Sequence, residues 1–348
     1  MVDWDLAVAT GQRLVRPGPV VGREEAREIV DELRAGAKES EGHVREYTGL
    51  HADTASAPIA VIDREGWVQA NADGFRVLMR PLVEKVTAKR TPSAASTAVG
   101  SRITGFEAGA LLGYLAGKVL GQFDPFWDGD QPGTAGRLLL VAPNIVHVER
   151  QLAVDPHDFR LWVCLHEETH RVQFTAVPWL REHLRGEIQE LVDATSLDPA
   201  DLTAMAKDGL ERAIRLARGD QDVSVIDLFQ TPEQRAVVDR ITAAMSLLEG
   251  HADVVMDGVG PDVIPTVDTI RTKFNQRRQG GGTLDQLLRR LLGFDAKMRQ
   301  YRDGAKFVRG VVDEVGMDGF NRVWSSPEAL PSKPEIGDPA AWVRRVHG

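Results

Sequence analysis

The sequence predicts a mostly α-helical protein of the α+β type, with one small β-sheet. Two long segments, which begin at residues 155 and 231, combine an N-terminal helix cap with apolar residues at helical spacing. The clearest strand signal is confined to one stretch of apolar and β-branched residues between positions 137 and 148. A chain of 348 residues can bury a large core as one sizeable domain or as two small ones.

The first hundred residues are predicted to be helical and rich in charge. Residues 2–15 and 23–48 are each interpreted as a helix, and residues 71–89 as a third one. In the third helix we expect the apolar side chains to face inward, namely those of Phe75, Val77, Leu78 and Leu82. Residues 91–101 are small and polar, which favours a loop.

Residues 104–122 have a glycine at every fourth position. These are Gly105, Gly109, Gly113, Gly117 and Gly121. Because residues four apart share a helix face, this spacing predicts a helix whose backbone lies very close to another element. A membrane or oligomer contact is the alternative. Glu107 and Lys118 interrupt the segment and argue against a membrane span.

Two apolar runs, residues 137–142 and 145–148, predict β-structure. They are followed by the first of the two long helices. Asp155 is its expected N-cap, and Pro156 occupies the first helical position. Pro178 predicts that the helix stops near Val177.

The middle of this helix carries the sequence H-E-x-x-H, from His166 to His170. Two histidines four residues apart lie on one helix face, so both imidazoles can bind one metal ion. Glu167 between them can then reach a water molecule on that metal. The alternative is a pair of ordinary helix histidines beside surface glutamates. The apolar residues 161–165 favour the metal site, because they predict a buried helix.

A tetrahedral catalytic zinc needs a third protein ligand. Gln173 and Ala176 stand where a metzincin has glycine and histidine, which excludes that class. The best candidate is Glu249 on the second long helix. Thr231 and Gln234 predict a capping box at the start of that helix.

His251 is the rival third ligand, but it lies about 200° around the helix from Glu249, so only one of them can face the metal. A site that uses neither residue as the third ligand is the remaining alternative.

Asp253 is four residues after Glu249, and so is placed to accept a hydrogen bond from a ligating histidine. Its other interpretation is a surface acid in a salt bridge. Gly258 and Gly260 predict the end of this helix.

The E-x-x-x-D spacing after H-E-x-x-H resembles the gluzincin pattern, in which the glutamate is the third zinc ligand and the aspartate supports a histidine. Over almost its whole length, the chain resembles the zincin-like metallopeptidase type 2 family. Within that family it is similar to the subgroup named for an association with coenzyme F-420 (deazaflavin) biosynthesis. The resemblance rests on residues 61–68 with Asn71, the glycine-spaced segment, the two metal motifs, and residues 300–308.

This resemblance implies a zincin-like metal-binding core, which we expect at residues 101–260. Residues 1–100 and 261–348 would form helical regions on either side, or all three parts form one compact domain. The expected cofactor is one Zn²⁺ per chain, held by His166, His170 and Glu249. Glu167 would act as the general base and then donate a proton to the leaving amine. Tyr301, Arg302 and His251 are candidates for stabilising the oxyanion, and none has spacing that singles it out.

The expected function is therefore hydrolysis of a peptide or small amide, such as a glutamyl tail. In zincins, a sheet near the metal helix offers an edge strand that pairs with an extended peptide. The strand signal upstream of residue 155 fits that arrangement, although a plain core strand is the alternative. The alternative, from another class of function, is a binding protein with a catalytically idle zincin fold. Its partner would be a protein or a component of deazaflavin coenzyme biosynthesis.

The composition argues against nucleic acid, anionic membranes and secretion. A formal net charge of −9 argues against nucleic acid or an anionic membrane as the principal partner. Cys164 is the single cysteine, so no internal disulfide can form. Asp3 and Asp5 stand where a secretory signal would be basic. The sequence therefore predicts a cytoplasmic protein.

Overall fold

The computed structural model describes residues 2–51, 57–81, 83–84, 94–129, 136–194, 231–279 and 294–348. For residues 94–100, 278–279 and 294–302 it describes the backbone alone. The described elements in chain order are α1 (Trp4–Leu14), α2 (Arg23–Thr48), β1 (Ile59–Ile62), α3 (Arg64–Leu78), α5 (Ala94–Ala116), β2 (Gly121–Asp124), β3 (Arg137–Val141), α6 (Ala142–Leu152), α7 (Pro156–Ala176), α8 (Pro178–Ala194), α10 (Pro232–Val263), α11 (Val267–Gln279), α13 (Phe294–Phe320), the 3-10 helices η2 (Asn321–Trp324) and η3 (Pro327–Ala329), α14 (Lys333–Ile336) and α15 (Pro339–His347).

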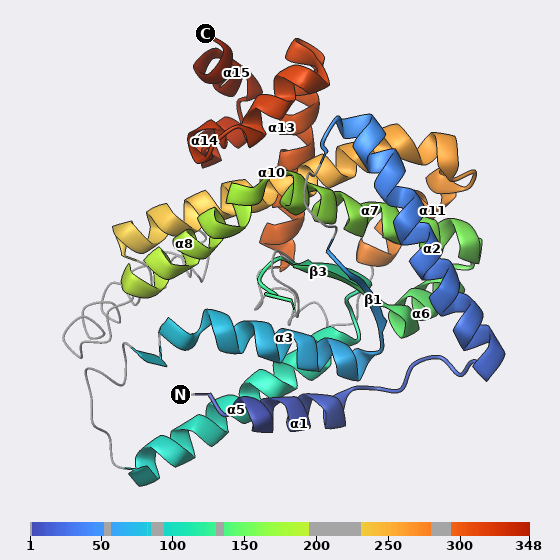
Figure 1. Ribbon diagram of the computed structural model, residues 1–348, viewed down its shortest axis with the longest axis vertical. Helices are drawn as coiled ribbons and strands as arrows, with labels where there is room; N and C mark the ends of the chain where they lie inside the picture. Colours follow the sequence, from blue (N-terminus) through green and yellow to red (C-terminus); the bar gives the residue numbers. More distant parts are fainter. Residues whose placement is uncertain are drawn as a thin grey trace, which may run out of the picture.

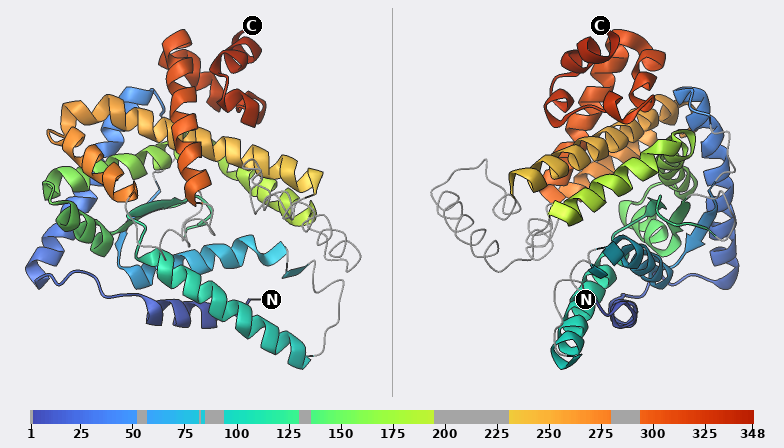
Figure 2. Two further views of the ribbon diagram at one scale, coloured as in Figure 1. Left: turned by 180° about the vertical axis from the view of Figure 1, so that it is seen from behind. Right: turned by 60° about the vertical axis from the view of Figure 1, so that its left-hand side comes forward.

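The fold is mostly helical with one small sheet, as predicted, and the sheet lies between layers of helices (Figure 1). Its strand order is β1-β3-β2, with β1 parallel and β2 antiparallel to β3. Helices α7 and α10 lie on one side of the sheet, and α3, α5 and α1 lie on the other (Figures 1 and 2). Because β2 is an edge of the sheet and contacts α7, the edge lies beside the helix that carries H-E-x-x-H.

Two apolar cores hold these layers together. The larger one contains buried side chains of α2, α7, α10 and α13, among them Leu33, Leu165, Leu247 and Phe307. The smaller core lies between α3 and α5 and includes Trp67 and Leu112. Full burial of one such leucine or phenylalanine stabilises the fold by roughly 1.5–3 kcal/mol, so the larger core fixes where the long helices cross.

Helix α7 begins and ends where its local signals predict. The side chain of Asp155 accepts a hydrogen bond from the backbone N–H of Asp158 at 3.0 Å. The helix ends at Ala176 with Val177 as its C-cap, and Pro178 opens α8. The predicted bounds are confirmed because both ends are set by residues next to them in the chain.

Helix α10 begins as predicted but ends later. Thr231 and Gln234 form the capping box, with Gln234 N–H donating to Thr231 Oγ1 at 3.2 Å. The expected stop at Gly258 and Gly260 is wrong, because α10 continues to Val263. At Gly258 the absence of a side chain serves packing instead, since a Cβ there would stand 2.1 Å from the ring of Tyr47.

The glycine-spaced segment packs closely against α1, and this expectation is confirmed. A Cβ added at Gly109 would stand 2.4 Å from the carbonyl oxygen of Ala7, and one at Gly105 would stand 2.5 Å from that of Asp3. The helix does not reach residue 122, however, since α5 ends at Ala116 and Gly121 opens β2. Among the described helices, none is long and apolar enough to cross a membrane.

The strand predicted over residues 145–148 is wrong, although that over residues 137–142 holds as far as Val141. Residues from Ala142 to Leu152 form α6 instead. Pro143 suits the first turn of a helix. Ile145, Val148 and Glu149 are buried at a spacing of three to four residues, so the same apolar run also fits a helix face.

The helix predicted over residues 71–89 begins earlier than expected and is interrupted at Met79. Asp63 caps α3 by accepting a hydrogen bond from Gly66 N–H at 2.7 Å, and α3 ends at Leu78. Residues 80–81 and 83–84 are again helical, and residues 85–89 lie outside the described residues. Phe75 and Val77 are exposed, at 44% and 51%, where inward positions were expected. Leu82 lies outside the described residues. The loop predicted over residues 91–101 is also wrong in part, because α5 begins at Ala94.

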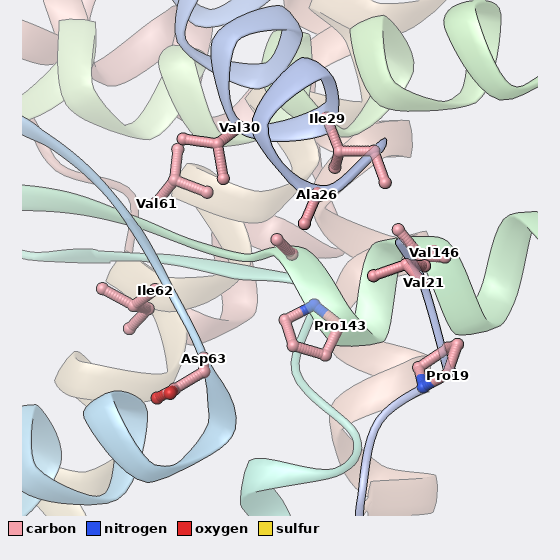
Figure 3. Close-up of a pocket in the computed structure, with 11 residues that line it drawn as sticks. Pro19, Val21, Ala26, Ile29, Val30, Val61, Ile62, Asp63, Pro143 and Val146 are labelled. Carbon is pink, nitrogen blue, oxygen red and sulfur yellow. The ribbon is translucent and has the colours of Figure 1, made fainter. Parts of the chain in front are cut away.

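A cavity of about 230 Å³ lies at the carboxyl ends of the parallel strands β1 and β3 (Figure 3). Its walls are apolar except for Asp63, and they come from β1, α2, α6 and the segment before α2. The cavity is therefore on the β1 side of the sheet, at the opposite edge from β2.

Candidate metal centre

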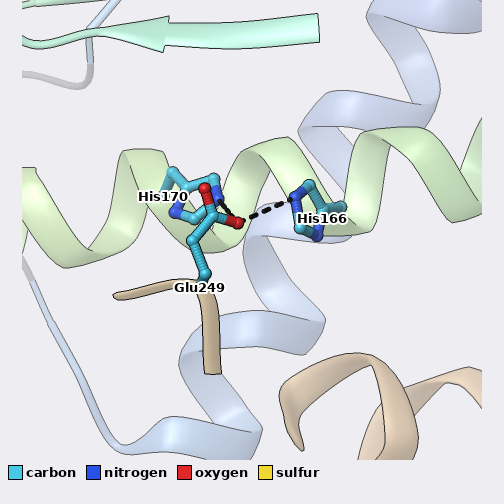
Figure 4. A group of neighbouring side chains, drawn as sticks. All are labelled: His166, His170 and Glu249. Atoms are coloured by element: carbon cyan, nitrogen blue, oxygen red, sulfur yellow. Dashed lines mark ion pairs between the residues drawn. The ribbon is translucent and has the colours of Figure 1, made fainter. Parts of the chain in front are cut away.

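Three predicted ligand side chains converge on one point between α7 and α10. The Nε2 atoms of His166 and His170 lie 3.7 Å and 3.5 Å from Oε2 of Glu249 (Figure 4). One ligand atom from each residue lies within 4.8 Å of the others. The two imidazole rings are nearly perpendicular, at 88°, with both Nε2 atoms directed to the same carboxylate. Two imidazoles and one carboxylate are a donor set suited to a divalent transition metal.

Helix packing explains why these side chains meet. The histidines share a face of α7, and α10 crosses that face with Glu249 directed at them (Figure 4). On the other side, α13 crosses α10 at two glycines: a Cβ at Gly250 would stand 2.1 Å from the carbonyl carbon of Gly304. The residue next to Glu249 is thus held against α13 at backbone contact.

The three groups also interact electrostatically. Burial disfavours the charged form of His170, but the carboxylates of Glu249 and Glu167 outweigh burial and raise the pKa of His170 to about 9. Oxygen atoms placed to attract a proton at this nitrogen are also placed to attract a metal cation. The electrostatics of the cluster therefore fit the presence of a positively charged ion.

The outer nitrogens of the two histidines have partners that sequence reasoning missed. Nδ1 of His170 lies 3.0 Å from Oε1 of Gln173, and Nδ1 of His166 lies 3.2 Å from Sδ of Met256. Gln173 entered the sequence argument only as a residue that excludes metzincins. Its position three residues after His170, on the same helix face, was a usable signal.

His251, the rival ligand and candidate oxyanion stabiliser, lies in a different environment from Glu249. Its side chain is fully buried, and its ring stacks on Phe320 at 5.3 Å and meets the edge of Trp324. Its Nδ1 lies 2.9 Å from Nε2 of Gln173. Burial, together with the charge of His170, lowers the pKa of His251 to about 3, so the ring is neutral at ordinary pH.

Glu167, the predicted general base, faces the edge strand. Its side chain is 7% exposed, and it lies directly against Gly121 at the start of β2. A Cβ at position 121 would stand 2.5 Å from Cγ of Glu167, closer than two such carbons can approach. Sequence spacing does not predict this contact, because the glycine pattern of residues 104–122 favours a helix that includes Gly121.

The opposite face of α7 is anchored by a buried ionic network. Glu168 accepts from Nε of Arg171 at 2.6 Å, and Arg171 also binds Glu41 of α2 at 2.5 Å. Burial outweighs these cations and raises the pKa of Glu168 to about 7. Cys164 is buried on the same side, where burial raises the pKa of its thiol and its Sγ contacts the carbonyl oxygen of Leu33.

The remaining predicted residues are Asp253 on α10 and Tyr301 and Arg302 on α13. Asp253 lies near Arg271, whose pKa is lowered by burial while the carboxylate of Asp253 acts in the opposite direction. Support of a histidine by Asp253 stays a prediction. Tyr301 and Arg302 belong to α13, but their side chains lie outside the described residues.

The buried helix α7 carries two histidines one turn apart beside a sheet edge, and a second helix adds a glutamate; this is the arrangement of a zincin-type metal site. A family model described as zincin-like metallopeptidase matches residues 2–343. The chain therefore belongs to the zincin-like metallopeptidase family, which confirms the resemblance at the family level. The family implies a metal ion, and His166, His170 and Glu249 fit one.

A solved structure supports the same assignment. It is described as a proposed hydrolase with a novel fold from Chloroflexus aurantiacus, and its sequence is 34% identical to this chain. The match covers 100% of this chain and 99% of that one, with a TM-score of 0.72. None of the curated proteins compared with the chain matches it.

Proposed function

We propose that the protein is a zinc-dependent hydrolase that cleaves a peptide or small amide bond with a metal-activated water. One observation carries this proposal: His166, His170 and Glu249 converge beside a buried glutamate at a sheet edge. The family match and the proposed hydrolase from Chloroflexus aurantiacus support the same reaction type.

His166, His170 and Glu249 would hold one zinc ion per chain, through Nε2 of each histidine and the carboxylate of the glutamate. Three protein ligands leave one position for water, which is the arrangement of catalytic zinc sites. When bound, zinc acts as a Lewis acid toward a carbonyl oxygen and lowers the pKa of coordinated water to ~7. His251 would not be a ligand, because its Nδ1 is committed to Gln173.

Glu167 would take the proton from the attacking water and pass it to the leaving amine. Its position favours this role, because it follows His166 directly, its carboxylate lies against Gly121 of β2, and its charge acts on His170. A buried carboxylate that reaches the water without binding the metal can exchange protons through both steps of the reaction. Asp253 would orient a histidine. Tyr301 or Arg302 would stabilise the oxyanion, and His251 would not, because its ring is fully buried between Phe320 and Trp324.

An extended substrate would pair with β2. A strand at a sheet edge presents backbone N–H and C=O groups to an added strand. The side chain of Gln122 is held from the other face, since it accepts from Trp67 Nε1 at 2.9 Å and donates to Asn71 Oδ1 at 3.1 Å. These bonds fix β2 to α3, so the strand is rigid where the substrate would lie.

The main alternatives are a smaller amide substrate and a protein without catalytic activity. A small amide, such as a glutamyl tail, would use the same zinc and the same Glu167 without needing the length of β2. The described residues give no observation that favours a catalytically idle fold or a direct role in coenzyme F-420 biosynthesis. We also propose a cytoplasmic location, which the single cysteine supports.

Glu167→Gln tests this function. Zinc-loaded protein would be incubated with a mixed peptide library and with γ-glutamyl amides, and the products identified by mass spectrometry. The variant should bind zinc as the wild type does and lose ~10²–10⁴-fold in product formation. Glu182→Gln on the surface of α8 is the matched control and should have no effect. Equal rates for Glu167→Gln and the wild type would remove Glu167 as the base, and zinc-loaded wild type that cleaves nothing would favour the idle fold.

A further inference from the structure

The side-chain amide of Gln173 joins the two helices that carry the proposed metal ligands. On α7, its Oε1 lies 3.0 Å from Nδ1 of His170. On α10, its Nε2 donates to the carbonyl oxygen of Leu248 at 3.0 Å and lies 2.9 Å from Nδ1 of His251. Gln173 and His251 are fully buried, so these bonds are shielded from bulk water. Bonds of this kind are stronger in a low-dielectric interior than at the surface.

These partners allow only one orientation of the amide. As found, the two N–H groups of Nε2 meet two acceptors, the carbonyl of Leu248 and Nδ1 of His251. If the amide turned over, Oε1 would face the carbonyl oxygen of Leu248, and two acceptors would be in contact. Oε1 is therefore the atom directed at His170, and Nδ1 of His170 must be the donor. A neutral histidine with its proton on Nδ1 has its lone pair on Nε2.

The surroundings of His251 also indicate that Nδ1 of His251 accepts a hydrogen bond from Nε2 of Gln173. An imidazole that accepts at Nδ1 carries its proton on Nε2, and Nε2 of His251 finds no hydrogen-bond partner among the described residues. A buried donor without a partner costs stability. Phenylalanine would fill the same slot between Phe320 and Trp324 without that cost. What the imidazole offers, and a phenyl ring lacks, is an acceptor for Gln173.

We propose that Gln173 is a positioning residue for metal binding and that His251 positions Gln173. Gln173 holds His170 in the tautomer whose Nε2 lone pair faces Glu249, and its bond to Leu248 fixes the spacing between α7 and α10 at the ligand cluster. The ligand geometry is then set before the metal arrives, which is the role of outer partners of ligating histidines. This inference rests on the proposed function, because it takes His170 as a metal ligand.

The tautomers can be read directly in the wild-type protein. Long-range ¹H–¹⁵N correlation spectra of zinc-loaded protein labelled at its nine histidines, assigned with single His→Gln variants, report which ring nitrogen carries each proton. His170 should coordinate through Nε2 with its proton on Nδ1, and His251 should carry its proton on Nε2. Coordination of His170 through Nδ1, or a His251 proton on Nδ1, would overturn the proposal without the need for any variant.

Variants test the energetic role. Gln173→Met keeps the length of the side chain but removes both hydrogen-bonding atoms, and should weaken zinc binding by ~10–100-fold. His251→Phe should have a smaller effect in the same direction, because Gln173 keeps its bond to Leu248. Gln189→Met on α8 is the matched control, because this glutamine donates to Asp193 on the surface of the protein, and the variant should bind zinc normally.

A purely structural role for Gln173 predicts a different pattern. The melting temperature of the chelated Gln173→Met variant would fall, while the folded variant would bind zinc with wild-type affinity and an unchanged His170 spectrum. That result would overturn the positioning proposal and leave the proposed function intact. Wild-type protein that binds no zinc at His166, His170 and Glu249 would instead overturn the proposed function. If Gln173→Met does not fold, the wild-type spectrum decides.

Discussion

Gly121 lies so close to the side chain of Glu167 that a Cβ at position 121 fits only if Glu167 or β2 moves. A Cβ at position 121 would stand 2.5 Å from Cγ and 2.9 Å from Oε1 of Glu167. Edge strand β2 can therefore approach the proposed general base only because residue 121 has no side chain. This contact sets the distance between the proposed base and any peptide that pairs with β2.

Gly121→Ala should separate catalysis from metal binding. The added methyl group must push Glu167 or β2 aside, and a displacement of about 1 Å at reacting groups can cost ~10²-fold in rate. Zinc affinity should change little, because the ligands lie on α7 and α10. Turnover of the substrate found with the peptide library, measured beside zinc titration, checks both parts.

Gly117→Ala is the matched control, because a Cβ there meets nothing closer than the carbonyl oxygen of Tyr114 at 3.8 Å. It should retain wild-type turnover. A Gly121→Ala enzyme with full activity would show that Glu167 tolerates displacement, and would argue against its role as the base.

Gly304→Ala should destabilise the protein at the crossing of α10 and α13. A Cβ at Gly304 would stand 1.8 Å from the carbonyl oxygen of Ser246, and backbone cannot yield as a flexible side chain does. We expect a loss of at least about 1–3 kcal/mol in the free energy of unfolding, the range for overpacked cores. Urea unfolding of chelated protein measures it. Gly186→Ala, whose Cβ meets nothing within 4 Å, should be neutral or slightly stabilising, and similar curves for both variants would contradict the close crossing.

His251 should make the metal-free protein sensitive to acid. Its pKa is about 3 in the fold and 6.5 in the unfolded chain, so between these values the unfolded state binds the extra proton. The stability contributed by neutral His251 is present above pH 6.5 and is lost as the pH falls toward 3. The slope approaches about 1.4 kcal/mol per pH unit.

The comparison with His251→Phe isolates this effect from other groups that titrate in the same window, such as Glu168. Urea unfolding of both chelated proteins from pH 7 to pH 4 should show a free-energy difference that changes with pH in favour of the variant at low pH. A difference that is constant across this range would mean that His251 titrates normally in the fold.

Local signals were enough to predict the elements that carry the ligands. Asp155 and Pro178 bound α7, and Thr231 with Gln234 starts α10, because each of these signals acts on backbone within a few residues. The ligand set could be predicted because helix geometry places residues four apart on one face. The end of α10 could not, because Tyr47, from a distant helix, packs where Gly258 had suggested a stop.

The rest of the site depends on tertiary contacts. β1 and β2 are four residues each, too short for a periodic pattern, and they are strands because they pair with β3. The contact of Gly121 with Glu167 joins residues far apart in sequence, and so does the bond from Gln173 to His251. Sequence spacing holds no information about which helices cross at these points.

Anomalous diffraction from crystals of zinc-loaded protein, recorded on both sides of the zinc absorption edge, tests the central claim most directly. We predict one strong peak per chain, bounded by Nε2 of His166, Nε2 of His170 and the carboxylate of Glu249, at about 2.0–2.2 Å from each. His251 should lie outside the coordination sphere, on the far side of Gln173. A crystal with no peak at this cluster, or with a peak coordinated by His251 in place of Glu249, would contradict the account.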